Sequence, residues 1–253
     1  MNWKQLISAK RFGMEEFHEE RQENRSEFQR DYDRLIFSAP FRRLQNKTQV
    51  FPLPGSVFVH NRLTHSLEVA SVGRSLGDDV AKALLERHPE LQDSFLPEIG
   101  SIVSAACLAH DLGNPPFGHS GEKAISTFFS EGKGVRLKEK QPNGEQLSPM
   151  EWEDLTHFEG NANAFRILTH QFEGRRKGGF VLTYTTLASI VKYPFSSSLA
   201  GTKSKFGFFV SEEESFQKIA TELGLTLLNE HPLKYARHPL VYLVEAADDI
   251  CYQ

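Results

Sequence analysis

The stretch AHDLGNPPFGH, residues 109–119, places two imidazoles and a carboxylate around a short, rigid turn. His110 and Asp111 close an apolar segment, and His119 follows after two consecutive prolines. An imidazole can bind a divalent cation or move a proton near neutral pH, and a carboxylate can assist in either task. The two prolines restrict the backbone between the two histidines.

His110 is expected to face the protein interior. At about 100° per residue it falls on the same helical face as Ile99, Val103 and Ala106. A single histidine on an apolar face is more often a hydrogen-bonded core residue than a metal ligand. Its position beside Asp111, directly before a turn with a second histidine, keeps the ligand interpretation open.

A second inward carboxylate is predicted in the last segment, HPLVYLVEAADDICYQ. Taking Leu240 as part of the buried stripe, Asp248 lies about 80° from it and Asp249 lies about 180° away. A carboxylate turned toward a core is costly unless it is paired or bound to a cation. Asp248 is therefore expected either in a buried salt bridge or at a metal, and Asp249 in water.

His65, near the start of a predicted helix, offers a further imidazole. Together with His110, Asp111 and Asp248 it gives a mixed nitrogen and oxygen donor set, which suits a divalent transition metal or magnesium. These residues come from three separate helical segments. Their spacing alone does not establish that the three segments converge.

The elements that must position these residues are predicted to be mostly helical, so the expected fold class is all-α, a helical bundle with long loops and at most a minor β-hairpin. Helical patterns cover about 61–86, 97–112, 120–129, 157–172, 211–225 and the segment from Pro239 onward. Segment 180–195 is compatible with strand or helix, and its spacing favours helix. Segment 130–154 has no periodic apolar face and is expected to be a surface loop or insertion.

Residues 1–35 are expected to form a polar arm or helix with a solvated face, and residues 36–253 a single domain. The net charge of −4 and the sequence pI near 6.2 argue against a protein whose main role is nonspecific binding to nucleic acid. Cys107 and Cys251 form no CxxC pair, which argues against a disulfide framework or a thiolate zinc site. No apolar run approaches the roughly 20 residues of a membrane span, so we expect a cytoplasmic protein.

Five ordered motifs identify a family resemblance: NRLTHSLEV, CLAHDLGNPPFGHSGEKAI, FEGNANAFRIL, VKYPF and VEAADDICY. In this order they resemble the deoxyguanosine triphosphate triphosphohydrolase branch of the HD-domain phosphohydrolases, and they cover residues 34–253 in patches. The resemblance implies an HD-type helical domain. Because the sequence stops inside a helical pattern, we expect that domain to be truncated at its C-terminal end.

The resemblance implies roles for the residues singled out above. His65, His110, Asp111 and Asp248 would hold a divalent metal, with Mn²⁺ or Mg²⁺ expected. His119 and Glu122 match the catalytic pair of the family. A spacing of three on a helix lets the carboxylate orient the imidazole and raise its basicity.

The resemblance also implies a nucleotide pocket. Gln49, Val50 and Asn161 match residues near the sugar and base, and Tyr252 would lie beside the sugar. Lys192 matches a phosphate contact with Tyr193 as its neighbour, and Arg62 would meet a phosphate oxygen. Without the family, these side chains would be interpreted as solvated charges or as boundary residues of the core.

The implied activity is metal-dependent hydrolysis of a deoxynucleoside triphosphate, dGTP preferred, to the deoxynucleoside and intact triphosphate. Two alternatives remain open: an HD-domain phosphohydrolase acting on another nucleotide, and a noncatalytic nucleotide- or metal-binding module. The family further implies a homo-oligomer and an effector that is single-stranded DNA or a nucleotide.

Overall fold

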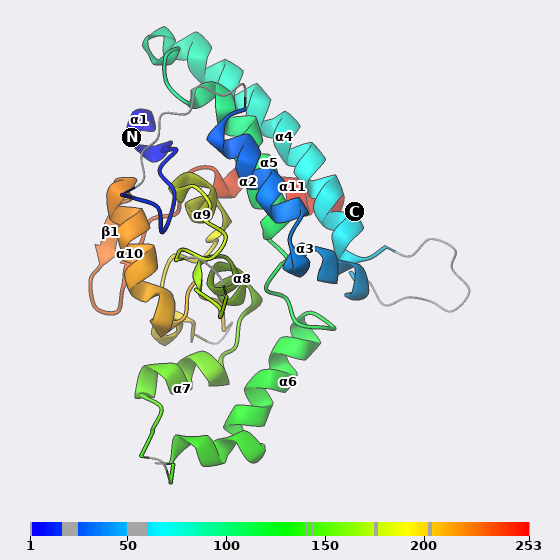
Figure 1. Cartoon of the computed structure of the whole chain (residues 1–253), viewed down its shortest axis with the longest axis vertical. Coiled ribbons are helices and arrows are strands. Elements are labelled where there is room, and N and C mark those ends of the chain that lie inside the picture. Colours follow the sequence, from blue (N-terminus) through cyan, green and yellow to red (C-terminus); the bar gives the residue numbers. More distant parts are fainter. Residues whose placement is uncertain are drawn as a thin grey trace.

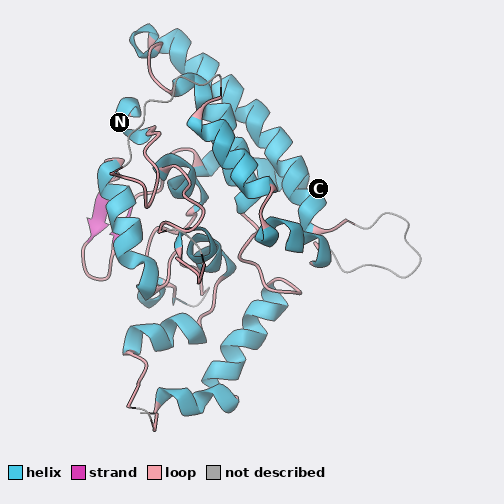
Figure 2. Ribbon diagram, viewed as in Figure 1, coloured by secondary structure: helices cyan, strands magenta, loops and turns pink. Residues whose placement is uncertain are grey.

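The computed structural model describes residues 2–16, 25–49, 60–139, 141–142, 144–174, 177–201 and 204–252. The described part is mostly helical, as Figures 1 and 2 show, which confirms the predicted all-α class. The α-helices are α1 Trp3–Leu6, α2 Glu27–Ile36, α3 Ala39–Arg43, α4 Arg62–Arg87, α5 Ile99–Ala109, α6 His119–Ser130, α7 Pro149–Thr156, α8 Gly160–Thr169, α9 Tyr184–Ile190, α10 Glu213–Glu222 and α11 Val241–Cys251. Short 3₁₀ helices include η1 Leu44–Asn46, η2 Pro89–Leu91, η3 Leu96–Glu98, η4 Lys133–Lys138, η5 Ser197–Leu199 and η7 Val210–Glu212.

A minor β-hairpin is also present. Strand β1 Leu227–Asn229 pairs antiparallel with β2 Lys234–Tyr235. It lies beside α10 at the edge of the molecule (Figure 1). The sequence allowed such a hairpin but did not place it.

Helix α5 forms the centre of the fold. Every residue from Ile99 to Ala109 is buried, because α2, α4, α9 and α11 all pack against this helix. The approach of α4 to α5 depends on glycine: a Cβ on Gly77 would lie 2.7 Å from the Cα of Gly100. The core therefore holds the end of α5, where His110 and Asp111 follow, in a fixed place.

Helix α2 has a buried face opposite its exposed residues, so it is not simply a polar arm. Phe28, Asp31 and Leu35 are buried, and the helix packs on α5. Ser26 caps its start by accepting a hydrogen bond from the backbone of Gln29. The high density of charged residues conceals an apolar stripe in this segment, which composition alone did not reveal.

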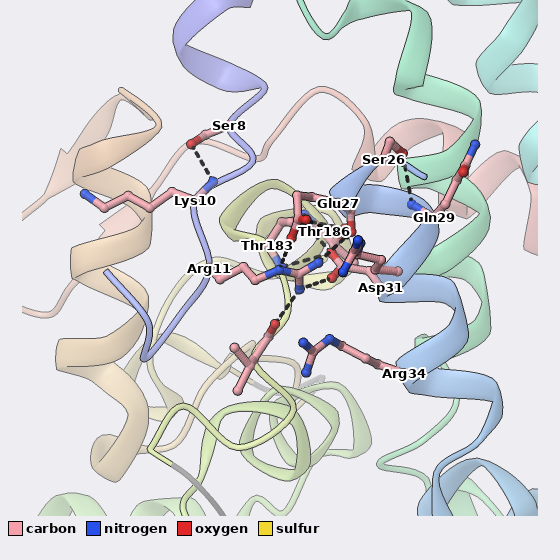
Figure 3. A network of polar contacts seen from close by, with 12 residues as sticks. Ser8, Lys10, Arg11, Ser26, Glu27, Gln29, Asp31, Arg34, Thr183 and Thr186 are labelled. Carbon is pink, nitrogen blue, oxygen red and sulfur yellow. Dashed lines mark hydrogen bonds and ion pairs between the residues drawn. The ribbon is translucent and has the colours of Figure 1, made fainter. Parts of the chain in front are cut away.

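A buried polar cluster ties the N-terminal segment to α2 and to the start of α9 (Figure 3). Arg11 donates to Asp31 Oδ1 at 2.7 Å and to the carbonyl of Val181 at 2.6 Å, and it also contacts Glu27. The other oxygen of Asp31 accepts hydrogen bonds from the backbone and the hydroxyl of Thr183, at 2.9 and 2.6 Å. Three segments distant in the sequence thus meet at one carboxylate.

Segment 130–154 is not purely a surface loop, which corrects the prediction. Part of it forms η4, and its end enters α7. A capping box begins α7, because the Ser148 side chain accepts from the backbone of Glu151 and the Glu151 side chain accepts from the backbone of Ser148. Figure 1 shows that α6 and α7 extend together from the rest of the chain.

Two predicted helix limits shift by a few residues. Helix α5 ends at Ala109, so His110 and Asp111 lie in the turn that follows rather than inside the helix. Helix α11 begins at Val241 rather than at Pro239, because a turn at 239–240 precedes it. Segment 180–195 contains α9, as its spacing favoured.

None of the helices in the described ranges has both the length and the apolar character to cross a membrane.

Candidate metal and catalytic site

A cavity of about 500 Å³ lies where the start of α4, the turn after α5, the start of α6 and the helix α11 meet. The predicted site residues in its lining are Gln49, Arg62, His110, Asp111, His119, Glu122, Asn161, Lys192, Tyr193, Asp248 and Tyr252. His65 is fully buried and hydrogen-bonds to Asp248. Val50 lies outside the described residues. The structure thus gathers segments that are more than 180 residues apart into one site.

The predicted metal ligands lie close together: His65 on α4, His110 and Asp111 in the turn after α5, and Asp248 on α11. The His65 Nε2 atom lies 2.9 Å from Asp248 Oδ1, and His110 Nε2 lies 3.6 Å from both Asp248 Oδ1 and Asp111 Oδ1. Ligand atoms of His65, His110 and Asp111 all lie within 4.8 Å of one another. These distances leave two nitrogens and two carboxylates around one small volume.

The hydrogen bonds of His110 orient it as a ligand. Its Nδ1 donates to the carbonyl oxygen of Cys107 at 2.6 Å, which directs Nε2 toward the carboxylates. Nε2 is buried and has no hydrogen-bond partner among the described residues. A buried nitrogen without a partner is costly, and a bound cation would satisfy it. The residues present therefore fit a divalent metal ion.

The electrostatics of this cluster favour positive charge. Burial lowers the pKa of His110, but the carboxylates of Asp111 and Asp248 outweigh burial and raise that pKa to about 9. Burial raises the pKa of Asp248, but its contacts with His110 and His65 hold that pKa well below the usual range. A divalent cation would supply the same charge and release the proton from the imidazole.

Asp111 is held by neighbours that the sequence did not identify as a group. Its Oδ2 accepts from Arg62 at 2.7 Å, and its Oδ1 accepts from the side-chain amide of Asn114. Lys47 donates to the carbonyl of Asn114 at 2.5 Å, and Asn163 donates to the carbonyl of Gly113 at 2.8 Å. The turn that joins the two histidines is therefore fixed by side chains as well as by its prolines.

His119 and Glu122 form a pair at the start of α6. The His119 Nδ1 atom lies 2.7 Å from Glu122 Oε2, and Glu122 Oε1 accepts from the backbone of Gly160 at 2.8 Å. The His119 side chain is 85% exposed, whereas Glu122 is buried. The buried Glu122 carboxylate thus orients the exposed His119 imidazole in the cavity lining.

Cations line the cavity, each beside a carboxylate. Lys192 Nζ lies 2.9 Å from Glu245, and Lys205 Nζ lies 2.5 Å from Glu159. Burial lowers the pKa of Lys205, but Glu159 outweighs it and raises the pKa, so the ammonium stays charged. Sequence reasoning missed Lys205, because nothing distinguishes it from the other residues of its Ser/Gly/Lys-rich loop.

The chain is similar in sequence to known proteins. Residues 62–178 match the HD domain family. A deoxyguanosinetriphosphate triphosphohydrolase-like protein of Synechocystis sp. is 46% identical over the whole chain, and one of Pseudomonas aeruginosa is 47% identical over the whole chain. A deoxyguanosinetriphosphate triphosphohydrolase of Yersinia enterocolitica is 37% identical. The chain covers 58%, 55% and 53% of these three relatives, so it spans about half of their length.

Proposed function

We propose that this chain hydrolyses deoxynucleoside triphosphates. Residues 62–178 match the HD domain family, and the whole chain is similar to deoxyguanosinetriphosphate triphosphohydrolase-like proteins. The products would be the deoxynucleoside and intact triphosphate, with dGTP as the preferred substrate. The convergence of His65, His110, Asp111 and Asp248 beside the His119–Glu122 pair supports this proposal most directly.

His65, His110, Asp111 and Asp248 would hold one divalent metal, Mn²⁺ or Mg²⁺. When bound, such an ion polarises a phosphate oxygen and lowers the pKa of water. Arg62 holds Asp111 in place through the 2.7 Å contact and faces the cavity. In this arrangement its guanidinium also meets the negative charge of the phosphates.

His119 would move the proton of the reaction, between the attacking water or the ester oxygen and bulk solvent. Glu122 accepts from His119 Nδ1, which leaves Nε2 as the atom that exchanges the proton. Lys192 and Lys205 would bind the triphosphate as it gains charge. To do so they exchange their contacts with Glu245 and Glu159 for contacts with phosphate.

The remaining lining would bind the nucleoside. Gln49 Oε1 is buried and has no hydrogen-bond partner among the described residues, so it can accept from a sugar hydroxyl. Asn161 and the exposed ring of Tyr252 also line the cavity. We include in the proposal a cytoplasmic location, a homo-oligomer, and regulation by single-stranded DNA or a nucleotide.

Two neighbouring aspartates provide a matched test of the metal site. We expect Asp248→Ala to lose both bound Mn²⁺ and turnover, because Asp248 contacts both histidines. Asp249→Ala should keep both, because Asp249 is exposed one residue further along α11. Metal content is measured by mass spectrometry after dialysis, and turnover with dGTP, dATP, dCTP, dTTP and GTP. Equal metal content in the two variants would refute the ligand assignment.

His119→Ala separates chemistry from metal binding. The side chain does not contact the proposed ligands, so the variant should retain one equivalent of metal and lose turnover. Full turnover in this variant would remove His119 from the mechanism. Bound metal without turnover in the unmodified chain would instead favour the alternative of a binding module.

A further inference from the structure

Residues 115–118 form a tight turn whose third residue is unusual. The backbone of Gly118 donates to the carbonyl of Pro115 at 3.1 Å, with Pro116 and Phe117 between them. Phe117 has a φ of 67°, in the left-handed region. A turn with proline second and positive φ third is of type II, where glycine or asparagine normally occupies the third position. A phenylalanine there is strained.

Packing does not explain this phenylalanine. Its side chain is 68% exposed and lines the cavity, and no aromatic ring of the described residues contacts it. By contrast, Phe128 on α6 is 47% exposed but packs edge-on against Phe129 with ring centroids 5.1 Å apart. Backbone strain of this kind, when packing does not explain it, is typical of active sites and ligand-binding sites.

The residue after Phe117 lies close to Arg62. Gly118 has a φ of 54°, and a Cβ on it would lie 2.7 Å from Nη2 of Arg62. Arg62 therefore packs directly against the turn, and it also holds Asp111. Phe117 thus lines the cavity in the turn that Arg62 contacts, two residues before His119.

We propose that Phe117 is a substrate-binding residue that places its ring against the nucleobase of the bound nucleotide. This inference rests on the proposed function, because it takes the ligand of the cavity to be a nucleotide. An aromatic ring stacks on any nucleobase, since every base presents a planar face. The contact therefore contributes affinity for the nucleoside part and little choice between bases.

Three substitutions separate the ring from the backbone. Phe117→Tyr keeps the ring, Phe117→Ala removes it, and Phe117→Asn removes it while suiting the left-handed backbone. We expect Ala and Asn both to weaken dGTP binding roughly 5- to 150-fold, the range measured for loss of one base–aromatic stack. Tyr should bind like the unmodified chain. Phe128→Ala, on the far part of α6, is the matched control and should also bind normally.

Binding is measured by equilibrium dialysis of Mn²⁺-loaded protein, in a His119→Ala background so that dGTP persists. Inorganic triphosphate serves as a ligand without a nucleoside, and its affinity should stay within twofold in every variant. Normal dGTP binding by Phe117→Asn, with impaired binding by Phe117→Ala, would show a backbone role and overturn the proposal. Equal loss of dGTP and inorganic triphosphate would overturn it as well.

The result does not depend on catalysis. A protein that binds dGTP through Phe117 but hydrolyses no nucleotide would refute the proposed function and leave this inference standing. If the chain hydrolyses dGTP and Phe117→Ala leaves its KM unchanged, the proposed function stands and this inference is refuted. Failure of the unmodified chain to bind any nucleotide would overturn both.

Discussion

Replacing Arg11 with methionine should strongly destabilise the protein, because it leaves the buried carboxylate of Asp31 without its cationic partner. Asp31 has no exposed surface, and Arg11 is its cationic partner (Figure 3). Methionine fills part of the same volume without a charge. The variant also loses the hydrogen bonds to the carbonyls of Glu27 and Val181.

The expected loss is about 3–5 kcal/mol of unfolding free energy, the usual cost of removing one partner of a buried ion pair. Natural domains have only about 5–15 kcal/mol in total. Burial raises the pKa of Asp31, and without Arg11 nothing of comparable strength opposes it. An acid with a raised pKa in the fold stabilises the protein at low pH and loses that contribution as pH rises. The deficit should therefore be smaller at pH 5 than at pH 8.

Urea unfolding followed by far-ultraviolet circular dichroism at both pH values measures this effect. Arg25→Met is the matched control, because Arg25 pairs with Asp33 at the surface, where its side chain is 59% exposed. Such a pair contributes about 0–1 kcal/mol. If Arg11→Met cost no more than Arg25→Met, the reasoning about the buried carboxylate would be refuted.

Three further predictions concern stability and substrate binding. Burial raises the pKa of Asp154 to about 6. The contribution of this carboxyl to the unfolding free energy is therefore complete below pH 4 and is lost as the pH rises through 6. In urea unfolding, Asp154→Asn should add about 1–3 kcal/mol to the unfolding free energy at pH 7.5 and nothing at pH 4. Gly113→Ala should cost about 1–3 kcal/mol and weaken Mn²⁺ binding by calorimetry, because its Cβ would lie 2.0 Å from the carbonyl of Gly160. Lys205→Met should raise KM for dGTP roughly 10- to 100-fold. It should also lower the melting temperature, because it leaves the buried Glu159 without its ammonium partner. An unchanged KM would remove Lys205 from the phosphate contacts.

Helical periodicity carried the most reliable sequence predictions. It directed His110 inward and separated Asp248 from Asp249, and the structure has this arrangement: Asp248 contacts both histidines and Asp249 is exposed. Periodicity works here because α5 and α11 are short, regular helices against one core. His65 was included as a further imidazole near the start of a predicted helix, and only the family resemblance implied that the three segments meet at one metal.

The contacts that hold the site could not be predicted from local patterns. Lys47 reaches the turn at Asn114, and Lys205 reaches Glu159, each over a long stretch of chain. Such pairs depend on how helices pack, and charged residues of this kind usually lie in water. The burial of α2 was missed because its many charged residues conceal a local apolar stripe. The capping box at Ser148 was a local signal for α7, and composition obscured it.

The most direct test of the central claim is the identity of the products formed from dGTP. Purified protein with Mn²⁺ is incubated with dGTP, and the products are separated by anion-exchange chromatography. The proposed function predicts deoxyguanosine and inorganic triphosphate in equal amounts, both absent with His110→Ala. Release of phosphate or diphosphate, with deoxyguanosine di- or monophosphate as the second product, would contradict it.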